Sequence, residues 1–368
     1  MIFQKVLLKS LREGLNNTAI IDANTSYTYQ EVLEKANMIT HQLLESKTAN
    51  GTYVGIVVDN RAHFIISMIG IMNAGCVFVP IDDTLPVSRL KEMAKQLELN
   101  HLISSNSDLF EGLDINHVFG LNTIFEASNQ TPVTYPNYDE NDSIYVYFTS
   151  GSTGIPKGVV GKNKSLTQFV QWEIEEFDID TTFKVSQFIS PYFDAFLRDV
   201  FVPLVAGATL VIPPNEDDFF TPSKMIDWID DNEISLIHCV PSVFRVFSDK
   251  GIIKADMFSS LQYVLMSGEK IVPAELTFWY ETFKDSITLV NLYGTTETTM
   301  IRSFYRILPS DTKKARMPIG QPINDTELLI LNKEMKKNAL LIPGDLYIVS
   351  NYMTKGYLNR PDLTAEKF

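Results

Sequence analysis

Apolar residues recur along the chain at a spacing typical of helices, interrupted by short runs that are typical of strands. Residues 29–46 carry four apolar side chains on one helical face, at Val32, Ala36, Ile39 and Leu43. The run from Tyr53 to Val58 is short and rich in β-branched residues, which predicts a strand. This beginning predicts that helices and strands alternate along the chain.

Six further apolar runs are too short to be helices, and most of them are separated by segments of helical length. They occupy residues 102–104, 144–148, 208–212, 234–240, 261–266 and 287–292. Strands that alternate with helices form mainly parallel sheets covered by helical layers. The predicted fold class is therefore α/β.

Two segments of the chain share one pattern. Residues 74–80 and 206–213 each begin with Ala-Gly, continue as a strand-like run and end in proline, and each follows a helical apolar stretch. Either the chain contains an internal duplication with two similar sheet halves, or two common helix–turn–strand units resemble each other by chance. After Arg306 the strand-like pieces become shorter and are punctuated by proline and glycine, which predicts a small β-subdomain.

The stretch from Phe64 to Ile81 is the most apolar one and has nearly the length of a membrane span. Residues 73–75, Asn-Ala-Gly, interrupt it and Pro80 closes it, so it predicts helix, turn and strand instead. Residues 1–11 lack both the sustained apolar run and the cleavage site of a signal peptide. We therefore expect a cytoplasmic protein that has no membrane partner.

Charge and cysteine content exclude two further classes of protein. With 31 basic and 45 acidic side chains the formal net charge is −14, so attraction to a phosphate backbone cannot be the main source of affinity, and no nucleic-acid partner is expected. The two cysteines, Cys76 and Cys239, each lie inside an apolar run, which predicts buried reduced thiols rather than a disulfide framework.

The strongest chemical signal is a loop rich in glycine and hydroxyl residues that follows the strand predicted at 144–148. Residues 147–158 read Tyr-Phe-Thr-Ser-Gly-Ser-Thr-Gly-Ile-Pro-Lys-Gly. Glycines let backbone N–H groups turn inward around an anion, hydroxyls add donors, and Lys157 adds positive charge, so the loop predicts a polyphosphate site rather than a flexible surface turn. A Walker-type loop would need glycine before this lysine and Ser or Thr after it, whereas Pro156 and Gly158 stand there.

This loop resembles that of the adenylate-forming superfamily, which contains adenylation domains of nonribosomal peptide synthetases, acyl-CoA synthetases and luciferases. Four other segments are similar to motifs of that family and occur in the same order. They are residues 73–82 (NAGCVFVPID), 193–195 (FDA), 293–299 (YGTTETT) and 356–368 (GYLNRPDLTAEKF). The resemblance covers essentially the whole chain, and it implies two similar layered α/β sheet halves in an αβαβα arrangement plus a small β-barrel-like subdomain.

The resemblance also implies a domain organisation. Residues 1–306 would form the layered adenylation core and residues 307–368 the start of the β-subdomain. The family's ribose-binding segment, its hinge and its small C-terminal lid domain with a catalytic lysine would all lie beyond Phe368. We expect binding to survive without that lysine but adenylation to be slow, because one cation aimed at the transition state would be missing.

The family's nucleotide site transfers onto three groups of residues. The phosphates of ATP would be bound by Thr149, Ser150, Gly151, Ser152, Thr153, Gly154 and Lys157. Adenine would be bound by Gly268, Glu269, Tyr293 and Gly294, with the Tyr293 ring stacked on it. Thr296, Glu297 and Lys157 would be catalytic, and Glu297 would hold Mg²⁺, a hard cation that prefers carboxylate oxygen.

The family's substrate site places Asp194 against the α-ammonium group of an amino acid, because a cation that enters an apolar cleft needs a carboxylate partner. A helix-capping role is the alternative for this aspartate. The lining positions would be Ala195, Arg198, His238, Leu265, Ser267, Leu292, Met300 and Ile301. His238, Leu265, Ser267 and Leu292 are similar to serine-selecting pockets, whereas Arg198 could pair with an acidic side chain or turn outward.

The implied function is ATP-dependent activation of an α-amino acid as an aminoacyl-adenylate, which is then loaded onto the phosphopantetheine thiol of a peptidyl carrier protein. The amino acid, the carrier protein and the missing C-terminal subdomain of the same synthetase are the expected partners. Two alternatives stay open, an acyl- or aryl-CoA synthetase core and a non-catalytic nucleotide-binding module. Asp194 argues against the first, and intact Thr296, Glu297 and Lys157 argue against the second.

Overall fold

The computed structural model describes residues 2–23, 25–105, 115–127, 132–149 and 156–368. The chain divides into two compact units. The first consists of Met1–Pro214 together with Thr354–Phe368, and the second consists of Asn215–Met353. The expected boundary between residues 306 and 307 falls inside the second unit. It stays a prediction.

The first unit contains a six-stranded sheet with the strand order β6-β5-β3-β4-β7-β8. Its strands are β3 (Tyr53–Val57), β4 (Val77–Pro80), β5 (His101–Ser104), β6 (His117–Gly120), β7 (Ser143–Thr149) and β8 (Lys157–Lys162). All neighbours are parallel except β7 and β8, which pair antiparallel. Every residue of β4 is buried, as expected of a central parallel strand with both faces covered.

A second group of strands in the first unit has the order β9-β10-β1-β2. Their bounds are β1 (Thr18–Asp22), β2 (Thr25–Thr28), β9 (Lys184–Ser186) and β10 (Thr209–Ile212). β1 pairs parallel with β10 and antiparallel with β2, and β9 pairs parallel with β10. β2 and β9, at the two ends of this order, are more than 150 residues apart in the sequence. Pairing between distant segments, rather than a local signal, therefore brings these strands into one sheet.

Helices cover these strands. Those of the first unit are α1 (Phe3–Glu13), α2 (Tyr29–Glu45), α3 (Arg61–Asn73), α4 (Val87–Leu97), α5 (Leu121–Glu126), α6 (Asn163–Glu176), α7 (Phe196–Ala206) and α11 (Pro361–Lys367). The predicted face of α2 is buried, and its N-terminus carries a reciprocal cap between Thr28 and Glu31. α3 is buried on all sides from Phe64 onward, which explains why its sequence has the apolarity of a membrane span.

The two similar segments adopt the predicted helix–turn–strand structure. α3 leads into β4, and α7 leads into β10. Each turn contains a glycine in the left-handed region, with φ of 83° at Gly75 and 78° at Gly207. A Cβ at position 75 would lie 1.9 Å from Asn50 Oδ1, so glycine is required there for space as well as for conformation.

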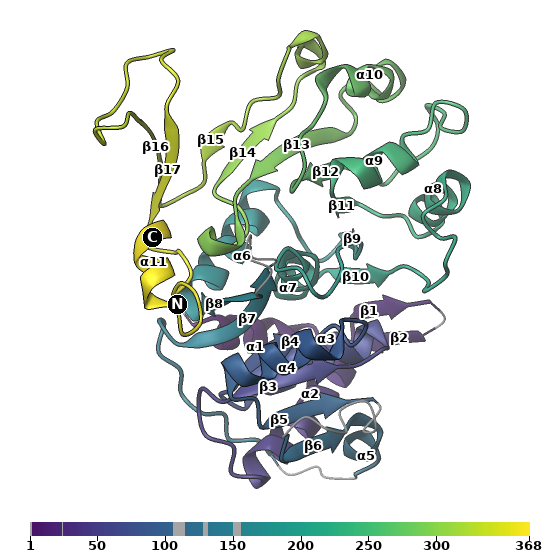
Figure 1. Ribbon diagram of the computed structural model, residues 1–368. Helices are drawn as coiled ribbons and strands as arrows, with labels where there is room; N and C mark the ends of the chain where they lie inside the picture. Colours follow the sequence, from purple (N-terminus) through teal and green to yellow (C-terminus); the bar gives the residue numbers. More distant parts are fainter. Residues whose placement is uncertain (1, 24, 106–114, 128–131, 150–155) are drawn as a thin grey trace. The chain divides into compact units, whose positions relative to one another are not determined.

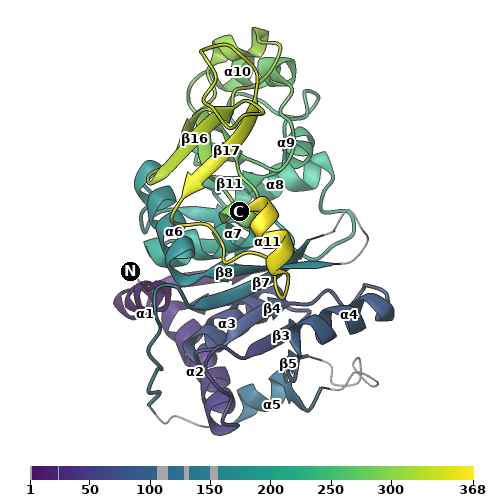
Figure 2. The same cartoon turned by 60° about the vertical axis from the view of Figure 1, so that its left-hand side comes forward.

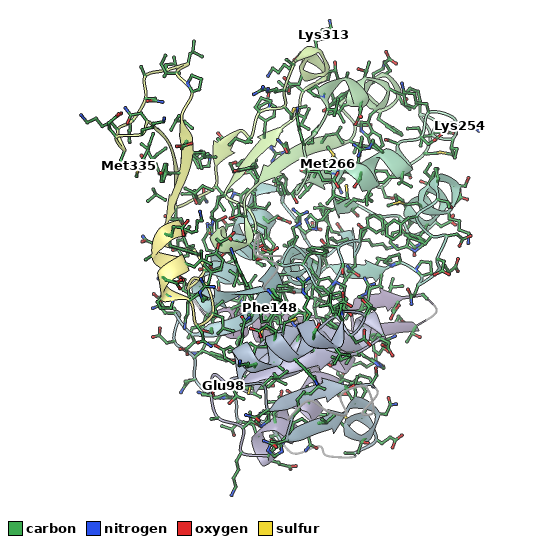
Figure 3. All side chains as sticks on the ribbon, viewed as in Figure 1. Glu98, Phe148, Lys254, Met266, Lys313 and Met335 are labelled. Atoms are coloured by element: carbon green, nitrogen blue, oxygen red, sulfur yellow. The ribbon has the colours of Figure 1, made fainter. Side chains whose placement is uncertain are left out.

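The second unit contains strands in the order β15-β14-β13-β12-β11. Their bounds are β11 (Leu236–Cys239), β12 (Tyr263–Met266), β13 (Thr288–Tyr293), β14 (Ser303–Arg306) and β15 (Gln321–Pro322). β11, β12 and β13 are parallel, whereas β14 and β15 continue the order antiparallel. Figure 3 shows Met266, the last residue of β12, inside this unit and Lys313 at its periphery.

Short helices surround these strands. They are α8 (Pro222–Asp231), α9 (Pro241–Phe247), α10 (Thr277–Phe283) and the 3-10 turns η2 (Pro273–Leu276), η3 (Thr296–Thr298) and η4 (Pro309–Lys313). A cluster of aromatic rings packs between α9 and α10, with Trp279 in contact with Phe244, Phe258 and Phe283. This cluster forms the aromatic core on one side of the second unit.

The β-rich region expected after Arg306 includes a hairpin of β16 (Thr326–Leu331) and β17 (Asp345–Ser350), which is drawn in yellow-green to yellow in Figure 1. The two strands pair antiparallel over their full length. In the described residues this hairpin forms a two-stranded sheet of its own. The expected β-subdomain of residues 307–368 stays a prediction.

Two expectations about the chain's surroundings can be compared with the structure. Within the described ranges, no helix is long and apolar enough to cross a membrane. Cys76 and Cys239 are both buried free thiols, as predicted.

Candidate active site

The glycine- and hydroxyl-rich loop connects β7 to β8. Thr149 and Lys157 are directly paired in the β7–β8 ladder, and the Thr149 Oγ1 lies 3.5 Å from the Lys157 carbonyl oxygen. Figure 3 marks Phe148, which precedes Thr149 on β7. Because β7 is parallel to β4, the loop leaves the carboxyl end of a parallel strand, where α/β sheets bind their ligands. Five of the predicted phosphate-binding residues fall on the loop itself and lie outside the described residues, namely Ser150, Gly151, Ser152, Thr153 and Gly154.

The C-terminal segment of the first unit covers the outer edge of β8. Val160 N–H donates to the Gly356 carbonyl at 3.0 Å, and Leu358 N–H donates to the Gly158 carbonyl at 2.7 Å. The Lys157 Nζ lies 5.8 Å from the centre of the Tyr357 ring. Figure 2 shows α11, which follows this segment, beside β7 and β8. The strand that carries Lys157 is therefore held on both sides.

A second contact fixes the point where the loop returns to the sheet. The Gln96 side chain on α4 donates to the Pro156 carbonyl at 3.2 Å, and the Asn359 side chain donates to the Gln96 carbonyl at 2.8 Å. The sequence singled out residues 356–368 as a motif, but it did not show that they support Pro156 through Gln96. No local signal could have done so, because Asn359 and Gln96 are more than 260 residues apart.

Asp194 lies in the turn that precedes α7 and is half-buried. The N-cap residue of that helix is Ala195, so Asp194 lies one position before the cap. Burial raises the pKa of the Tyr147 hydroxyl well above its ordinary value, and the nearby Asp194 carboxylate adds to the shift. The Asp194 carboxylate thus lies near a neutral tyrosine hydroxyl, and Asp194 is not the N-cap residue of α7.

α7 places two charged side chains next to each other in the protein interior. Arg198 and Asp199 are both fully buried. The Asp199 Oδ2 accepts hydrogen bonds from the backbone N–H groups of Phe188 (3.1 Å) and Ile189 (2.9 Å), which ties α7 to the segment after β9. The Arg198 guanidinium has no hydrogen-bond partner among the described residues. The possibility that Arg198 turns outward to solvent is therefore wrong.

In the second unit, the parallel strands bring four predicted lining residues together near their carboxyl ends. His238 on β11 is the register partner of Leu265 on β12, and both are fully buried. Leu265 pairs with Val290, two positions before Leu292 on β13, so Leu292 projects from the same face. The Ser267 N–H donates to the Cys239 carbonyl at 3.1 Å, which keeps Ser267 beside the end of β11.

Met300 and Ile301 lie against the end of β13 because of an unusual turn. Thr299 and Met300 both have positive φ, 63° and 65°, and the chain then returns so that the Arg302 N–H donates to the Tyr293 carbonyl at 2.8 Å. A Cβ at Gly294 would lie 2.1 Å from the Met300 carbonyl oxygen. The glycine of the Tyr-Gly motif therefore permits the close approach of Met300.

Thr296 and Glu297 lie on η3, which begins two residues after this glycine, and both are half-buried. The turn is supported by the fully buried Arg302, whose guanidinium donates to the carbonyl groups of Thr298 and Tyr352. Sequence reasoning did not identify Arg302, because nothing local distinguishes it from a surface arginine. Its two contacts hold the turn that carries Glu297.

The metal assignment can be tested against the donor set. Among the described residues, no three His, Cys, Asp or Glu side chains form a cluster that could hold a metal ion. Mg²⁺ is commonly bound by only one or two carboxylates together with substrate phosphates. A single half-buried Glu297 with the neighbouring Thr296 hydroxyl fits that mode of binding, and it does not fit a dedicated protein cage.

Gly268 and Glu269 follow β12. Gly268 has a φ of 85°, in the region that favours glycine. The Glu269 carboxylate accepts hydrogen bonds from the Ser242 backbone N–H (3.0 Å) and hydroxyl (2.8 Å) at the N-terminus of α9. This side chain therefore stabilises a helix end, and its expected contact with adenine stays a prediction.

The predicted site residues are divided between the two units of the chain. Thr149, Lys157, Asp194, Ala195 and Arg198 belong to the first unit, and the other described ones belong to the second. Each unit orders its own set at strand ends or at the beginning of a helix.

Comparison with known proteins gives the family. The family model of AMP-binding enzymes matches residues 8–358. Bacitracin synthase 1 of Bacillus licheniformis is 31% identical over 358 residues, which are 96% of this chain and 7% of that protein. The chain thus spans only a small part of this relative.

Two solved structures have the same fold. The N-terminal subdomain of Klebsiella oxytoca NpsA in complex with 3-hydroxyanthranilyl-AMSN superposes with a TM-score of 0.87 at 22% identity, over 100% of this chain and 91% of that chain. The AMPPNP-bound form of the nonribosomal peptide synthetase FmoA3 gives a TM-score of 0.89 at 25% identity, over 100% of this chain and 39% of that chain. These likenesses confirm the layered α/β fold, and the family match confirms the adenylate-forming resemblance. The chain belongs to the family of AMP-binding enzymes.

Proposed function

We propose that the chain activates an α-amino acid with ATP and forms an aminoacyl-adenylate for nonribosomal peptide synthesis. The single observation that carries the ATP part is the pairing of Thr149 with Lys157 at the carboxyl end of β7. This pairing fixes the backbones of a threonine and a lysine at the two ends of a loop that is rich in further hydroxyl and glycine residues. The AMPPNP-bound relative and the bacitracin synthase relative support the same interpretation.

The proposed reaction is an in-line displacement at the α-phosphorus of ATP. A carboxylate oxygen of the amino acid forms a bond to the α-phosphorus, and the bond between the α-phosphorus and the oxygen bridging to the β-phosphate breaks. Pyrophosphate leaves with that electron pair, and the aminoacyl-adenylate remains. Lys157 and the loop donors would stabilise the charge on the β- and γ-phosphates as pyrophosphate departs.

The second unit would bind the nucleoside and the metal. Tyr293 would stack on adenine, and the backbone near Gly268 and Gly294 would allow the base to approach closely. Glu297 and Thr296 would hold Mg²⁺, which when bound would neutralise charge on the phosphates. Arg302 would act indirectly, because it fixes the turn that carries Glu297.

Asp194 would bind the α-ammonium group of the substrate. Its carboxylate is half-buried near a neutral Tyr147 hydroxyl, in the turn before α7. An ammonium group that leaves water needs such a partner. The side-chain positions would be Ala195, Arg198, His238, Leu265, Ser267, Leu292, Met300 and Ile301.

The product would be consumed by a carrier protein. The phosphopantetheine thiol would attack the carbonyl carbon of the adenylate, a thioester would form, and AMP would leave. A C-terminal subdomain of the same synthetase would supply the catalytic lysine of the first step, so the chain by itself would bind better than it turns over. We place this reaction in the cytoplasm, where ATP is abundant and the two cysteines stay reduced.

The test is a binding assay that needs no turnover. Nonhydrolysable aminoacyl-, aryl- and fatty-acyl-sulfamoyl adenosines are titrated into the chain, and thermal stabilisation is followed against AMP alone. A ligand present at 100 times its dissociation constant should add about 2.7 kcal/mol of stability. We expect one or a few aminoacyl analogues to stabilise the chain most strongly.

Matched variants separate the parts of the proposal. Asp194→Asn should abolish the preference for aminoacyl analogues while ATP binding survives, and Asp256→Asn, an exposed aspartate, should change neither. If aryl or fatty-acyl analogues bind best, the acyl- or aryl-CoA synthetase alternative takes the place of the proposal. If no acyl analogue binds better than AMP, the chain is a nucleotide-binding module.

A further inference from the structure

Arg198 is a buried cation that the described residues leave unpaired. Its side chain is 0% exposed, and Nε, Nη1 and Nη2 all lack a hydrogen-bond partner among the described residues. Arg302 is also 0% exposed, yet its guanidinium donates to the Thr298 and Tyr352 carbonyl groups. This chain therefore satisfies another buried arginine in the ordinary way, with backbone carbonyl groups.

An unpaired guanidinium in the protein interior is unfavourable. An arginine side chain keeps its charge in proteins and carries five N–H donors that need acceptors. Leaving a buried charge without a counter-ion is strongly destabilising, whereas a carboxylate or phosphate can satisfy the fork of donors with two parallel hydrogen bonds. Arg198 therefore has the properties expected of an anion-binding group.

The acidic residues next to Arg198 in sequence do not supply that anion. Asp199 follows it directly, but its Oδ2 accepts the Phe188 and Ile189 N–H groups on another side of the helix. Asp194 lies four residues earlier, in the turn before α7, and no hydrogen bond joins it to the Arg198 guanidinium. The Arg198 guanidinium is therefore hydrogen-bonded to neither of these two carboxylates.

We propose that Arg198 binds an anionic group on the side chain of the amino acid, so that the substrate is an acidic amino acid. This inference rests on the proposed function. Asp194 would take the α-ammonium group, and the α-carboxylate is the reacting group that must reach the α-phosphorus. The only part of the substrate left for Arg198 is the side chain, and a neutral side chain would leave the buried cation unpaired. The shared chemistry is a carboxylate or a phosphate.

The experiment compares isosteric ligands that differ in charge. Dissociation constants are measured by calorimetry for the sulfamoyl adenosines of aspartate, glutamate and O-phosphoserine, and for those of asparagine, glutamine and serine. At least one acidic analogue should bind about 10-fold or more tightly than its neutral counterpart, as is typical of a hydrogen-bonded charge. The aspartate and glutamate arms report a carboxylate, and the phosphoserine arm reports a phosphate.

Variants at position 198 test whether the arginine causes this preference. Arg198→Met should weaken the preferred acidic analogue by about 10-fold or more and leave its neutral counterpart within about 3-fold. Arg198→Lys should fall between the two, because a lysine keeps the charge but loses the bidentate geometry. Arg316→Met, at an exposed arginine, is the matched control. Circular dichroism checks folding, and Arg198→Gln is used if the Met variant does not fold.

Failure of this inference can be told apart from failure of the proposed function. If a neutral aminoacyl analogue binds as tightly as its acidic isostere, or if Arg198→Met keeps the preference, Arg198 does not select the substrate while amino-acid activation stands. If Asp194→Asn weakens all aminoacyl analogues alike, the ammonium site is separate from the Arg198 site, as we infer. If no aminoacyl analogue binds better than AMP, the proposed function is wrong and this inference falls with it.

Discussion

Gly294 and Met300 touch so closely that a Cβ on the glycine would lie 2.1 Å from the methionine carbonyl oxygen. The contact brings the end of β13 against the turn that follows η3. Backbone atoms on both sides make this approach, so neither side can relax by changing a rotamer. The glycine of the Tyr-Gly motif is therefore a packing requirement.

Gly294→Ala should destabilise the protein by about 2–3 kcal/mol, because a backbone group must move to admit the methyl group. Urea unfolding measures the loss. Gly14→Ala is the control, since its Cβ would lie 3.5 Å from the nearest atom and should shift stability by under about 0.5 kcal/mol. Equal effects of the two substitutions would show that the close approach is unimportant.

Glu269→Ala should cost about 1–2 kcal/mol of folding free energy. The carboxylate accepts two hydrogen bonds from Ser242 at the N-terminus of α9, and losing them leaves helix donors without a partner. Glu275→Ala removes an exposed ion pair with Arg245, which also lies on α9, and should cost under about 0.5 kcal/mol. Chemical denaturation of both variants gives the comparison, and a larger effect at Glu275 would contradict the capping role.

Stability should fall in acid partly because of Asp311. Burial alone would raise the pKa of this carboxyl, but hydrogen bonds from Lys314, the Leu308 N–H and Tyr305 outweigh burial and hold the pKa below its ordinary value of 3.8. The folded pKa is depressed, so the stabilisation is present above pH 3.8 and is lost as pH falls through the folded pKa. We expect the stability difference between wild type and Asp311→Asn to be largest near neutral pH and to shrink below about pH 4. A difference independent of pH would refute this account.

Lys157→Met should weaken binding of Mg-ATP by about 10-fold or more, because a charge-assisted contact to phosphate is lost. Isothermal titration measures the dissociation constant. Lys91→Met, at an exposed lysine on α4, removes the same charge elsewhere and should leave the affinity unchanged. The same affinity in both variants would exclude Lys157 from the phosphate site.

Leu358→Ala should destabilise the first unit by about 3 kcal/mol. This leucine is 6% exposed and belongs to the core cluster that contains Val146 and Val160, so truncation leaves a cavity beneath β8. Leu340→Ala, at a side chain that is 89% exposed, should have no measurable effect. Hydrogen exchange of the β8 amides gives an independent readout, and unchanged protection there would show that residues 356–358 do not stabilise the strand.

Local periodicity was sufficient to predict most of the helices and strands near the site. The face of α2 and the strands β3, β5, β7, β10, β11, β12 and β13 all lie where the apolar pattern placed them. Their signals are local, because an apolar stripe or a short buried run is visible within one element. β1 and β9 gave no such signal. They are defined by pairing with β10, which for Ile20 and Leu210 joins residues 190 positions apart.

In the candidate site, too, local motifs predict some features, and contacts between distant residues determine the others. Sequence motifs predicted which residues occupy the strand ends, and the structure places His238, Leu265, Ser267 and Leu292 there. The contacts and the burial of each side chain could not be predicted. Glu269 is held by Ser242, 27 residues away, and Arg198 is buried although arginine is usually exposed. These facts depend on packing between elements, which a motif does not contain.

The first unit is discontinuous in sequence, because its last part, Thr354–Phe368, follows the whole of the second unit. During translation, β8 is therefore complete long before Gly356 and Leu358 arrive to cover its outer edge. An uncovered strand edge can pair with another chain and begin aggregation. A nascent chain that stalls before residue 354 would leave that edge uncovered. Residues 354–368 therefore complete the first unit only after the whole second unit has been synthesised.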